Sequence, residues 1–296
     1  MSGRPLTPVV LGHNAFFGVN HLSGRAGRDR ARAFHGPEPI VDFIHHAQRH
    51  GVRGLMLSTH PRSRAVCDHL RCDRRITDGL RVYPLLPYAQ KYVLRANEVG
   101  LMRAATETLR LSPLSERIKL GRDALRLLLR RDTLEALRGL IRVELGAFRR
   151  LDTHAVFLHD AFTDLVLALD APGAYEVYAD CLRRQLRVEV GLATKNLPFL
   201  LARMSRWGVP VPHILTHVNS AGFQMHPDRD SCVAALRSVD LSVMAMGTLA
   251  SGHIAPETAF TFHRGLPAIK SVCVGISRLE HLKPTIDALH VAGRLG

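Results

Sequence analysis

Strand-like and helix-like segments alternate along almost the whole chain, and this alternation restricts the fold more than any other feature. Short apolar runs bounded by turn residues predict strands, and the segments between them have the apolar spacing of amphipathic helices. Alternating strands and helices are typical of a parallel sheet covered by helices, here an α/β fold of the (β/α)8 TIM-barrel type. The eight expected strands are Pro8–Leu11, Gly54–Ser58, Arg81–Pro87, Ala155–His159, Val188–Ala193, His213–Val218, Leu241–Met246 and Ser271–Gly275.

The chain is predicted to form one TIM-barrel domain over residues 1–296, because no low-complexity linker or internal repeat divides it. Its length is typical of one such barrel, and 46% apolar residues can form a large core. Two segments are longer than an ordinary connection between a strand and a helix. One is the polar loop Gly18–Gly36, and the other is Val93–Arg150, predicted as a helical insertion (about 93–150) between strands 3 and 4. Long connections are usually functional or disordered, and we expect both segments to cover the active-site end of the barrel.

The chain is strongly basic, with a formal net charge of +14. Its arginines are spread widely and are densest between Arg117 and Arg150, where they alternate with leucines as on amphipathic helices. No aromatic residues are interleaved there, and no apolar run is long enough to span a bilayer, so we expect neither nucleic acid nor membrane as a partner. The charge instead favours an anionic small-molecule substrate. The five cysteines are odd in number and lack C-x-x-C spacing, which predicts reduced thiols and a cytoplasmic location.

Four histidines follow four different predicted strands. Active sites of these barrels lie at the C-terminal ends of the strands, so the four imidazoles are expected to meet there. Neutral imidazole binds divalent metal ions, and imidazole also acts as acid or base near neutral pH. We therefore predict a metal site at His13, His60, His159 and His217, with His159 and His60 as candidate acid and base. The chain contains 17 histidines, so a purely structural role remains an alternative for each.

Other strand ends carry groups that can bind an anion. Lys91 is a candidate catalytic residue that stabilises developing negative charge, and Lys195 and Asn219 are candidate substrate-binding residues. Gly275, Ser277 and Arg278 follow the last strand, where backbone N–H groups at a helix N-terminus often bind phosphate. Ser277 with Glu280 also has the spacing of a capping box, so helix capping alone is an alternative explanation of this segment.

The order and spacing of these segments resemble the aldo-keto reductases, a barrel family that usually transfers hydride from NADPH. Leu11–Gly18 is similar to their opening strand and glycine turn, and Ala47–Thr59 to the helix and strand that follow. Val156–His159 resembles the strand with their catalytic histidine, and Met244–Gly252 their seventh strand and its loop. Val274–Leu282 is similar to their cofactor-phosphate segment. The resemblance implies an aldo-keto reductase-like barrel in which Ser277 and Arg278 hold the cofactor phosphate.

The catalytic residues of that family carry over only in part. His159 matches the family's histidine, and Lys91 is the candidate for its lysine. Met56 stands where the family has aspartate, and Pro61-Arg62-Ser63 where it has the proton-donating tyrosine. Met246 occupies the position of the tyrosine that stacks on nicotinamide, and the serine–asparagine pair falls on Ala193 and Thr194. The resemblance therefore implies the scaffold more strongly than the redox chemistry.

Two enzymatic functions follow, and the first is preferred. It is a non-redox enzyme with acid–base chemistry, with or without a metal ion, of the isomerase, lyase or hydrolase type on an anionic small molecule. The alternative is an NADPH-dependent oxidoreductase of the aldo-keto reductase type, with His60 or His159 as a non-standard proton donor. The candidate cofactor is a divalent metal ion for the first function and NADPH for the alternative, and the sequence leaves the choice open. A non-catalytic binding protein that uses the basic surface is a third hypothesis.

Overall fold

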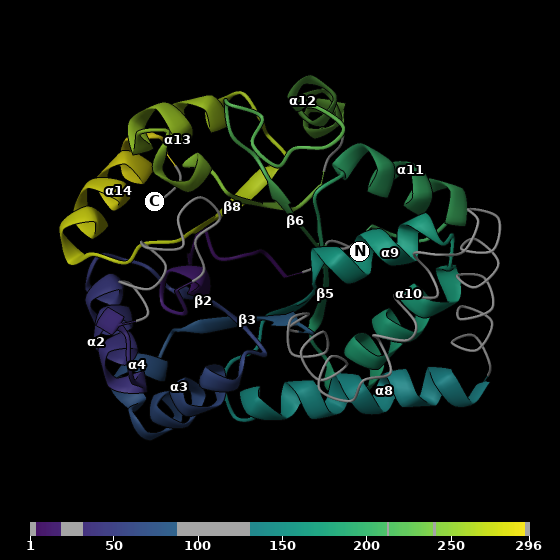
Figure 1. Ribbon diagram of the computed structural model, residues 1–296, viewed down its shortest axis with the longest axis horizontal. Helices are drawn as coiled ribbons and strands as arrows, with labels where there is room; N and C mark the ends of the chain where they lie inside the picture. The colour runs from purple at the N-terminus through teal and green to yellow at the C-terminus, as the bar shows by residue number, and fades with distance from the viewer. Residues whose placement is uncertain (1–3, 19–31, 88–130, 212, 239–240, 294–296) are drawn as a thin grey trace, which may run out of the picture.

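Eight strands close into a parallel barrel in which neighbours along the chain are neighbours in the sheet, and β8 pairs back with β1. The computed structural model describes residues 4–18, 32–87, 131–211, 213–238 and 241–293, and for residues 131–136 only the backbone. Figure 1 shows the strands at the centre with helices around them. The strands are β1 (Val9–Gly12), β2 (Gly54–Ser58), β3 (Arg81–Leu86), β4 (Ala155–Leu158), β5 (Glu189–Thr194), β6 (His213–His217), β7 (Val243–Met246) and β8 (Ile269–Val274).

Helices follow the strands, and several begin where proline fixes the first turn. Proline lacks an N–H group, which the first helical turn does not need, and this explains the starts of α2, α3, α10, α11 and α13. The α-helices are α2 (Pro37–Arg49), α3 (Pro61–Cys72), α4 (Arg74–Thr77), α8 (Arg131–Leu145), α9 (Asp160–Ala168), α10 (Pro172–Asp180), α11 (Leu197–Trp207), α12 (Arg229–Ser238), α13 (Pro256–Arg264) and α14 (Leu279–Val291). Short 3₁₀ turns are η1 (His13–Ala15), η2 (Gly146–Phe148) and η4 (Ala250–Gly252), and η3 (Cys181–Leu186) is a π-helix.

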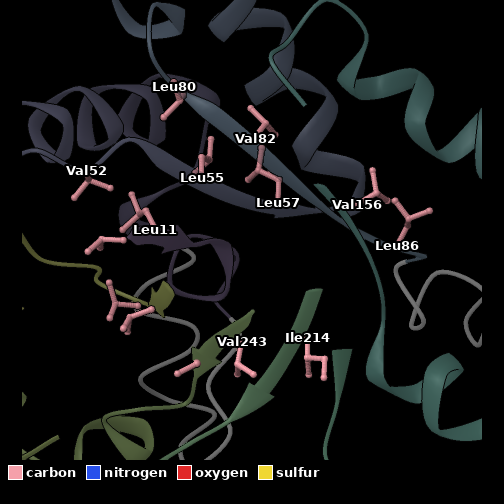
Figure 2. Close-up of a cluster of buried hydrophobic side chains, with 14 of the residues drawn as sticks. Leu11, Val52, Leu55, Leu57, Leu80, Val82, Leu86, Val156, Ile214 and Val243 are labelled. Carbon is pink, nitrogen blue, oxygen red and sulfur yellow. The ribbon is translucent and has the colours of Figure 1, made fainter. Parts of the chain in front are cut away.

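The side chains of each strand alternate between two apolar layers. On β2, Met56 belongs to the cluster inside the barrel, whereas Leu55 and Leu57 belong to the larger cluster between barrel and helices (Figure 2). Space inside the barrel is fully used: a Cβ atom on Gly191 would lie 2.4 Å from Cδ1 of the Phe157 ring. The barrel interior is therefore a packed core, and chemistry is left to the strand ends and their loops.

The predicted barrel is confirmed, with small differences at the element ends. Gly54–Ser58 has the predicted bounds, whereas the eighth strand begins at Ile269, two residues earlier than expected. The capping box at Ser277 is wrong, because α14 has Arg278 as its N-cap and no side-chain cap. Glu280 instead accepts a hydrogen bond of 3.2 Å from Nη1 of Arg278.

The two long connections are described only in part. Residues 19–31 of the predicted Gly18–Gly36 loop and residues 88–130, which include most of the predicted insertion, lie outside the described residues. Helices α8 and η2 form the described end of the insertion before β4. Among the described residues, no helix is both long enough and apolar enough to cross a membrane. The single-domain assignment stays a prediction.

Candidate active site

Three of the four predicted histidines lie together at the C-terminal ends of the strands. His13 is in η1 directly after β1, His60 is the N-cap residue of α3 after β2, and His159 is the N-cap residue of α9 after β4. Burial, followed by the charges of His60 and His159, lowers the pKa of His13 to about 3, against a smaller opposing effect of its hydrogen bond to the Met56 backbone. Electrostatic effects weaken with distance, so His60 and His159 both lie near His13.

His60 lies against an aromatic ring and is oriented by a helix terminus. Its ring stacks on Phe17, with centroids 4.6 Å apart and planes inclined by 21°. Its Nδ1 accepts a hydrogen bond of 3.1 Å from the Arg62 backbone N–H, so a neutral His60 carries its proton on Nε2. Burial first, and then the charge of Arg62, lowers the pKa of His60. His60 is thus a neutral hydrogen-bond donor at neutral pH.

His159 takes part in a charged chain of three residues. Its Nδ1 lies 2.6 Å from Oδ1 of Asp160, and Oδ2 of Asp160 lies 3.5 Å from Nζ of Lys195. Nδ1 also lies 3.2 Å from the Ala161 N–H, from which it can accept only in the other tautomer. The much shorter contact to the carboxylate oxygen requires a proton between the two atoms and favours the tautomer in which Nδ1–H donates to Asp160 and Nε2 is left for other partners. Burial alone would raise the pKa of Asp160, but the hydrogen bond from His159 and the charges of His159 and Lys195 hold it well below its usual range. His13, His60, His159, Asp160 and Lys195 are called the strand-end cluster below.

A second carboxylate fixes the loop that carries Lys195. Asp164 accepts hydrogen bonds from the Thr194 hydroxyl at 2.5 Å and from the Lys195 backbone N–H at 3.3 Å. Burial and the charge of Asp160 raise the pKa of Asp164, and these two hydrogen bonds lower it by less. Asn196 then caps α11 by accepting from the Phe199 N–H at 3.1 Å. The loop after β5 is therefore held rigidly, and Lys195 is positioned by it.

Two further predicted residues are engaged in local structure. The Asn219 amide donates to the Phe223 carbonyl at 2.9 Å and accepts from its N–H at 2.8 Å, so it mainly shapes the loop after β6. His217 packs on the turn after β7: a Cβ atom on Gly247, whose φ is +62°, would lie 2.3 Å from His217 Nδ1. Only glycine fits this backbone beneath the ring.

The predicted four-histidine metal site finds no support in the structure. Within the described parts of the chain, no group of three or more His, Cys, Asp or Glu side chains is placed to hold a metal ion. The Nδ1 atoms of His60 and His159 are already used as described, and His217 packs against Gly247. A groove of about 420 Å³ lies between α13 and α14, and none of the predicted site residues lines it. Lys91 lies outside the described residues.

The segment after β8 has features that fit a phosphate group. Around Gly275 there is open space, since an added Cβ would meet only the Ala15 Cβ, at 4.0 Å. Helix α14 starts without a side-chain cap, so its first N–H groups remain available to an anion. The Arg278 side chain is 69% exposed and its ion-pair partner among the described residues is the equally exposed Glu280. Gly275, Ser277 and Arg278 thus form a candidate phosphate site next to the end of η1.

Two residues of this region were not among the sequence-based candidates. Phe17 contacts both His60 and His13, and Arg62 lies over its ring, with Cζ 5.4 Å from the centroid. A signal for Arg62 was present in the sequence. Pro61 marks the first turn of a helix, and a cation there opposes the helix dipole, which is unfavourable unless another function compensates.

Comparisons with solved structures identify the barrel. No family profile and no curated protein sequence matches the chain. An aldo-keto reductase from Bacillus halodurans in its holo form superposes with a TM-score of 0.59 at 10% identity, covering 98% of this chain and 91% of that chain. An aldo-keto reductase from a Medee basin deep-sea metagenome library has a TM-score of 0.55 at 13% identity, covering 96% and 86%. A point mutant of the protein Gox0644 in complex with NADPH has a TM-score of 0.56 at 10% identity, covering 98% and 89%. The chain has the fold of the aldo-keto reductases.

This finding corrects the preferred functional prediction. A non-redox isomerase, lyase or hydrolase was expected, but two of these solved structures are described as aldo-keto reductases, and a third, the Gox0644 mutant, holds NADPH. The comparisons favour the alternative prediction, an oxidoreductase. The error arose because Met56 and Pro61-Arg62-Ser63 replace two expected catalytic residues, and their loss was taken as loss of the chemistry.

Proposed function

We propose that the protein is an NADPH-dependent oxidoreductase that reduces a carbonyl group of an anionic small molecule, with His159 as the proton donor. The observation that carries this proposal is the chain His159–Asp160–Lys195 beside His13 and His60. It supplies a proton donor whose tautomer is set by a carboxylate, at the barrel end where these folds place their chemistry.

Each residue of the strand-end cluster has a distinct task. Asp160 accepts the Nδ1–H of His159 and stabilises its imidazolium form, in which the Nε2–H is the proton transferred to the carbonyl oxygen; His159 is left as a neutral imidazole with its proton on Nδ1. His60, neutral and protonated on Nε2, donates a hydrogen bond to the same oxygen and polarises the carbonyl. Lys195 holds Asp160 as an anion and adds positive charge near the developing alkoxide. The deeply buried His13 stays neutral and limits the positive charge of the cluster.

The residues after β7 and β8 fit the cofactor that the fold implies. Ser277, Arg278 and the first N–H groups of α14 would hold its phosphates, and Met246 offers a partly buried apolar surface at the end of β7. NADPH, when bound, supplies the hydride that reduces the carbonyl carbon. Thr194 falls at one of the two positions where the aldo-keto reductases hold the nicotinamide carboxamide. Its hydroxyl donates to Asp164, so in this chain Thr194 orients the loop after β5.

Cofactor binding and proton donation are tested separately. Titration of the protein with NADPH, followed by the fluorescence of the cofactor, should give saturable binding that Arg278→Ala weakens about tenfold to a hundredfold, as for loss of a charged hydrogen bond. Arg237→Ala is the matched control, since Arg237 is an exposed arginine in the last turn of α12. Absence of NADPH binding by the wild-type protein would refute the proposal.

Proton donation is measured as NADPH oxidation with a panel of aldehydes and ketones. His159→Gln should lower kcat by about 10² to 10⁴, the usual contribution of a general acid. Asp160→Asn should lower kcat as well, because an amide does not fix the same tautomer and leaves Lys195 without its partner. NADPH binding should be unchanged in both variants. Full activity of His159→Gln would exclude it as the donor.

Two further expectations belong to this proposal. The five cysteines are unpaired in the structure, which supports a reducing compartment, the cytoplasm, as the proposed location. The anionic nature of the substrate is supported by the positive charge gathered near the strand-end cluster by Lys195 and Arg62.

A further inference from the structure

Arg62 stands where a cation is unfavourable on structural grounds. It lies in the first turn of the 12-residue helix α3, which contains no acidic residue in that turn. The N-terminus of a helix carries partial positive charge and repels cations. Residues that break such a local rule without visible compensation are often functional.

The guanidinium group is also poorly satisfied. Nη1 makes one long hydrogen bond of 3.5 Å to the Phe16 carbonyl, and Nη2 is covered by protein and has no hydrogen-bond partner among the described residues. No carboxylate of the described residues forms an ion pair with Arg62, whereas the partly buried Arg71, Arg138 and Arg203 each form one. Burial lowers the pKa of Arg62, which reflects a partly desolvated charge without a counter-ion.

The position of Arg62 links this charge to the strand-end cluster. Its backbone N–H donates to Nδ1 of His60, and its guanidinium lies over the same Phe17 ring on which His60 stacks. The charge of Arg62 reaches the His60 imidazole and lowers its pKa. One small molecule could therefore place an anionic group on Arg62 and a carbonyl group on His60, the residue that polarises the carbonyl.

We propose that Arg62 is the specificity-determining residue that binds the carboxylate of the substrate, so that the substrates are oxo acids rather than neutral carbonyl compounds. This inference rests on the proposed reductase function and deepens it. A planar guanidinium pairs with a carboxylate through two parallel N–H···O bonds, which fixes orientation as well as affinity. Because Nη2 is covered in the free protein, this pair requires the Arg62 side chain to turn Nη2 towards the substrate on binding. The positive end of α3 adds to the attraction, so the features that make Arg62 unfavourable in the free protein become favourable with an anion bound.

The test compares oxo acids with their uncharged methyl esters. Glyoxylate, 4-oxobutanoate and 5-oxopentanoate are each assayed beside the corresponding ester with NADPH. At least one acid should exceed its ester in kcat/KM by tenfold or more, and Arg62→Gln should remove this preference mainly by raising KM. Arg62→Lys should retain part of it, because charge remains without the bidentate geometry. Arg64→Gln, on an exposed neighbour in the same helix, should leave the preference unchanged.

A binding measurement separates this inference from the proposed function. Isothermal titration with succinate, and with succinamide as the uncharged control, requires no turnover. Succinate should bind the wild-type protein at least tenfold more tightly than it binds Arg62→Gln, with equal melting temperatures for the two proteins. Equal succinate binding by both proteins, or no acid preferred over its ester by an active enzyme, would overturn the role of Arg62. If no carbonyl compound is reduced while Arg62-dependent succinate binding persists, only the reductase proposal fails.

Discussion

Acid should destabilise this protein strongly through His13, and His13→Gln should relieve that effect. His13 is buried, with 7% of its surface exposed, and its pKa falls from 6.5 to about 3 in the folded state. A histidine with a lowered pKa binds its proton more readily in the unfolded chain. The unfolding free energy is therefore unaffected above about pH 6.5 and falls as the pH drops from there towards 3.

The magnitude follows from the two pKa values. Each pH unit between them corresponds to about 1.36 kcal/mol. At pH 4.5 about two units of this range have been crossed, so His13 should cost the wild-type protein about 2.7 kcal/mol relative to pH 7.5. Gln in place of His13 cannot be protonated and can still donate to the Met56 backbone.

Urea unfolding of both proteins at pH 7.5 and pH 4.5 measures this difference. The wild type should lose about 2 to 3 kcal/mol more than His13→Gln between the two pH values. The other histidines are present in both proteins, so their contributions largely cancel. An equal loss in both proteins would mean that the buried imidazole is hydrated or paired when charged, and would refute the reasoning.

Three further predictions test packing and buried polar groups in the barrel. Gly191→Ala should destabilise by about 1 to 3 kcal/mol in urea unfolding, because its Cβ would overlap the Phe157 ring, whereas Gly173→Ala in α10 meets nothing and should be neutral or slightly stabilising. His213→Leu should maintain stability at pH 7 and reduce the loss at pH 5, because burial lowers the pKa of an imidazole whose nitrogens have no hydrogen-bond partner in the described part of the chain; greater acid sensitivity would contradict this. Ser63→Ala should leave the melting temperature unchanged or raised, since its buried hydroxyl makes no hydrogen bond to any described residue, and a clear fall would contradict this.

Much of the candidate site was predictable because strand ends are visible in the sequence. His13, His60 and His159 each follow an apolar run, and a parallel barrel brings the C-terminal ends of all its strands to one side. The same argument does not predict the contacts of His217 with Gly247 and of Asn219 with Phe223, because these depend on the path of the following loops, and the role of both residues in the site stays a prediction. The path of a loop depends on tertiary contacts, and the periodic pattern of apolar residues in the sequence does not predict these contacts.

The start of α14 illustrates a competition that the sequence left undecided. Ser277 and Glu280 have the spacing of a capping box, yet Arg278 takes the N-cap position and pairs with Glu280. Local hydrogen-bonding preferences at a helix end differ by only about 1 kcal/mol, so the direction in which the chain leaves β8 can override them. That outcome left the helix N-terminus available to an anion.

The sequence by itself indicated the barrel, because eight strand-like segments that alternate with amphipathic helices over 296 residues are short-range patterns that a (β/α)8 barrel buries on both layers. β2 has the predicted bounds because Met56 packs inside the barrel while Leu55 and Leu57 pack between the barrel and the helices. Only the tertiary structure decided which charges meet. Asp160 reaches Lys195 across two loops, while Arg62 is left without a carboxylate in the described part of the chain. Charge pairing depends on distances of a few ångströms between segments far apart in sequence, and those distances exist only once the chain has folded.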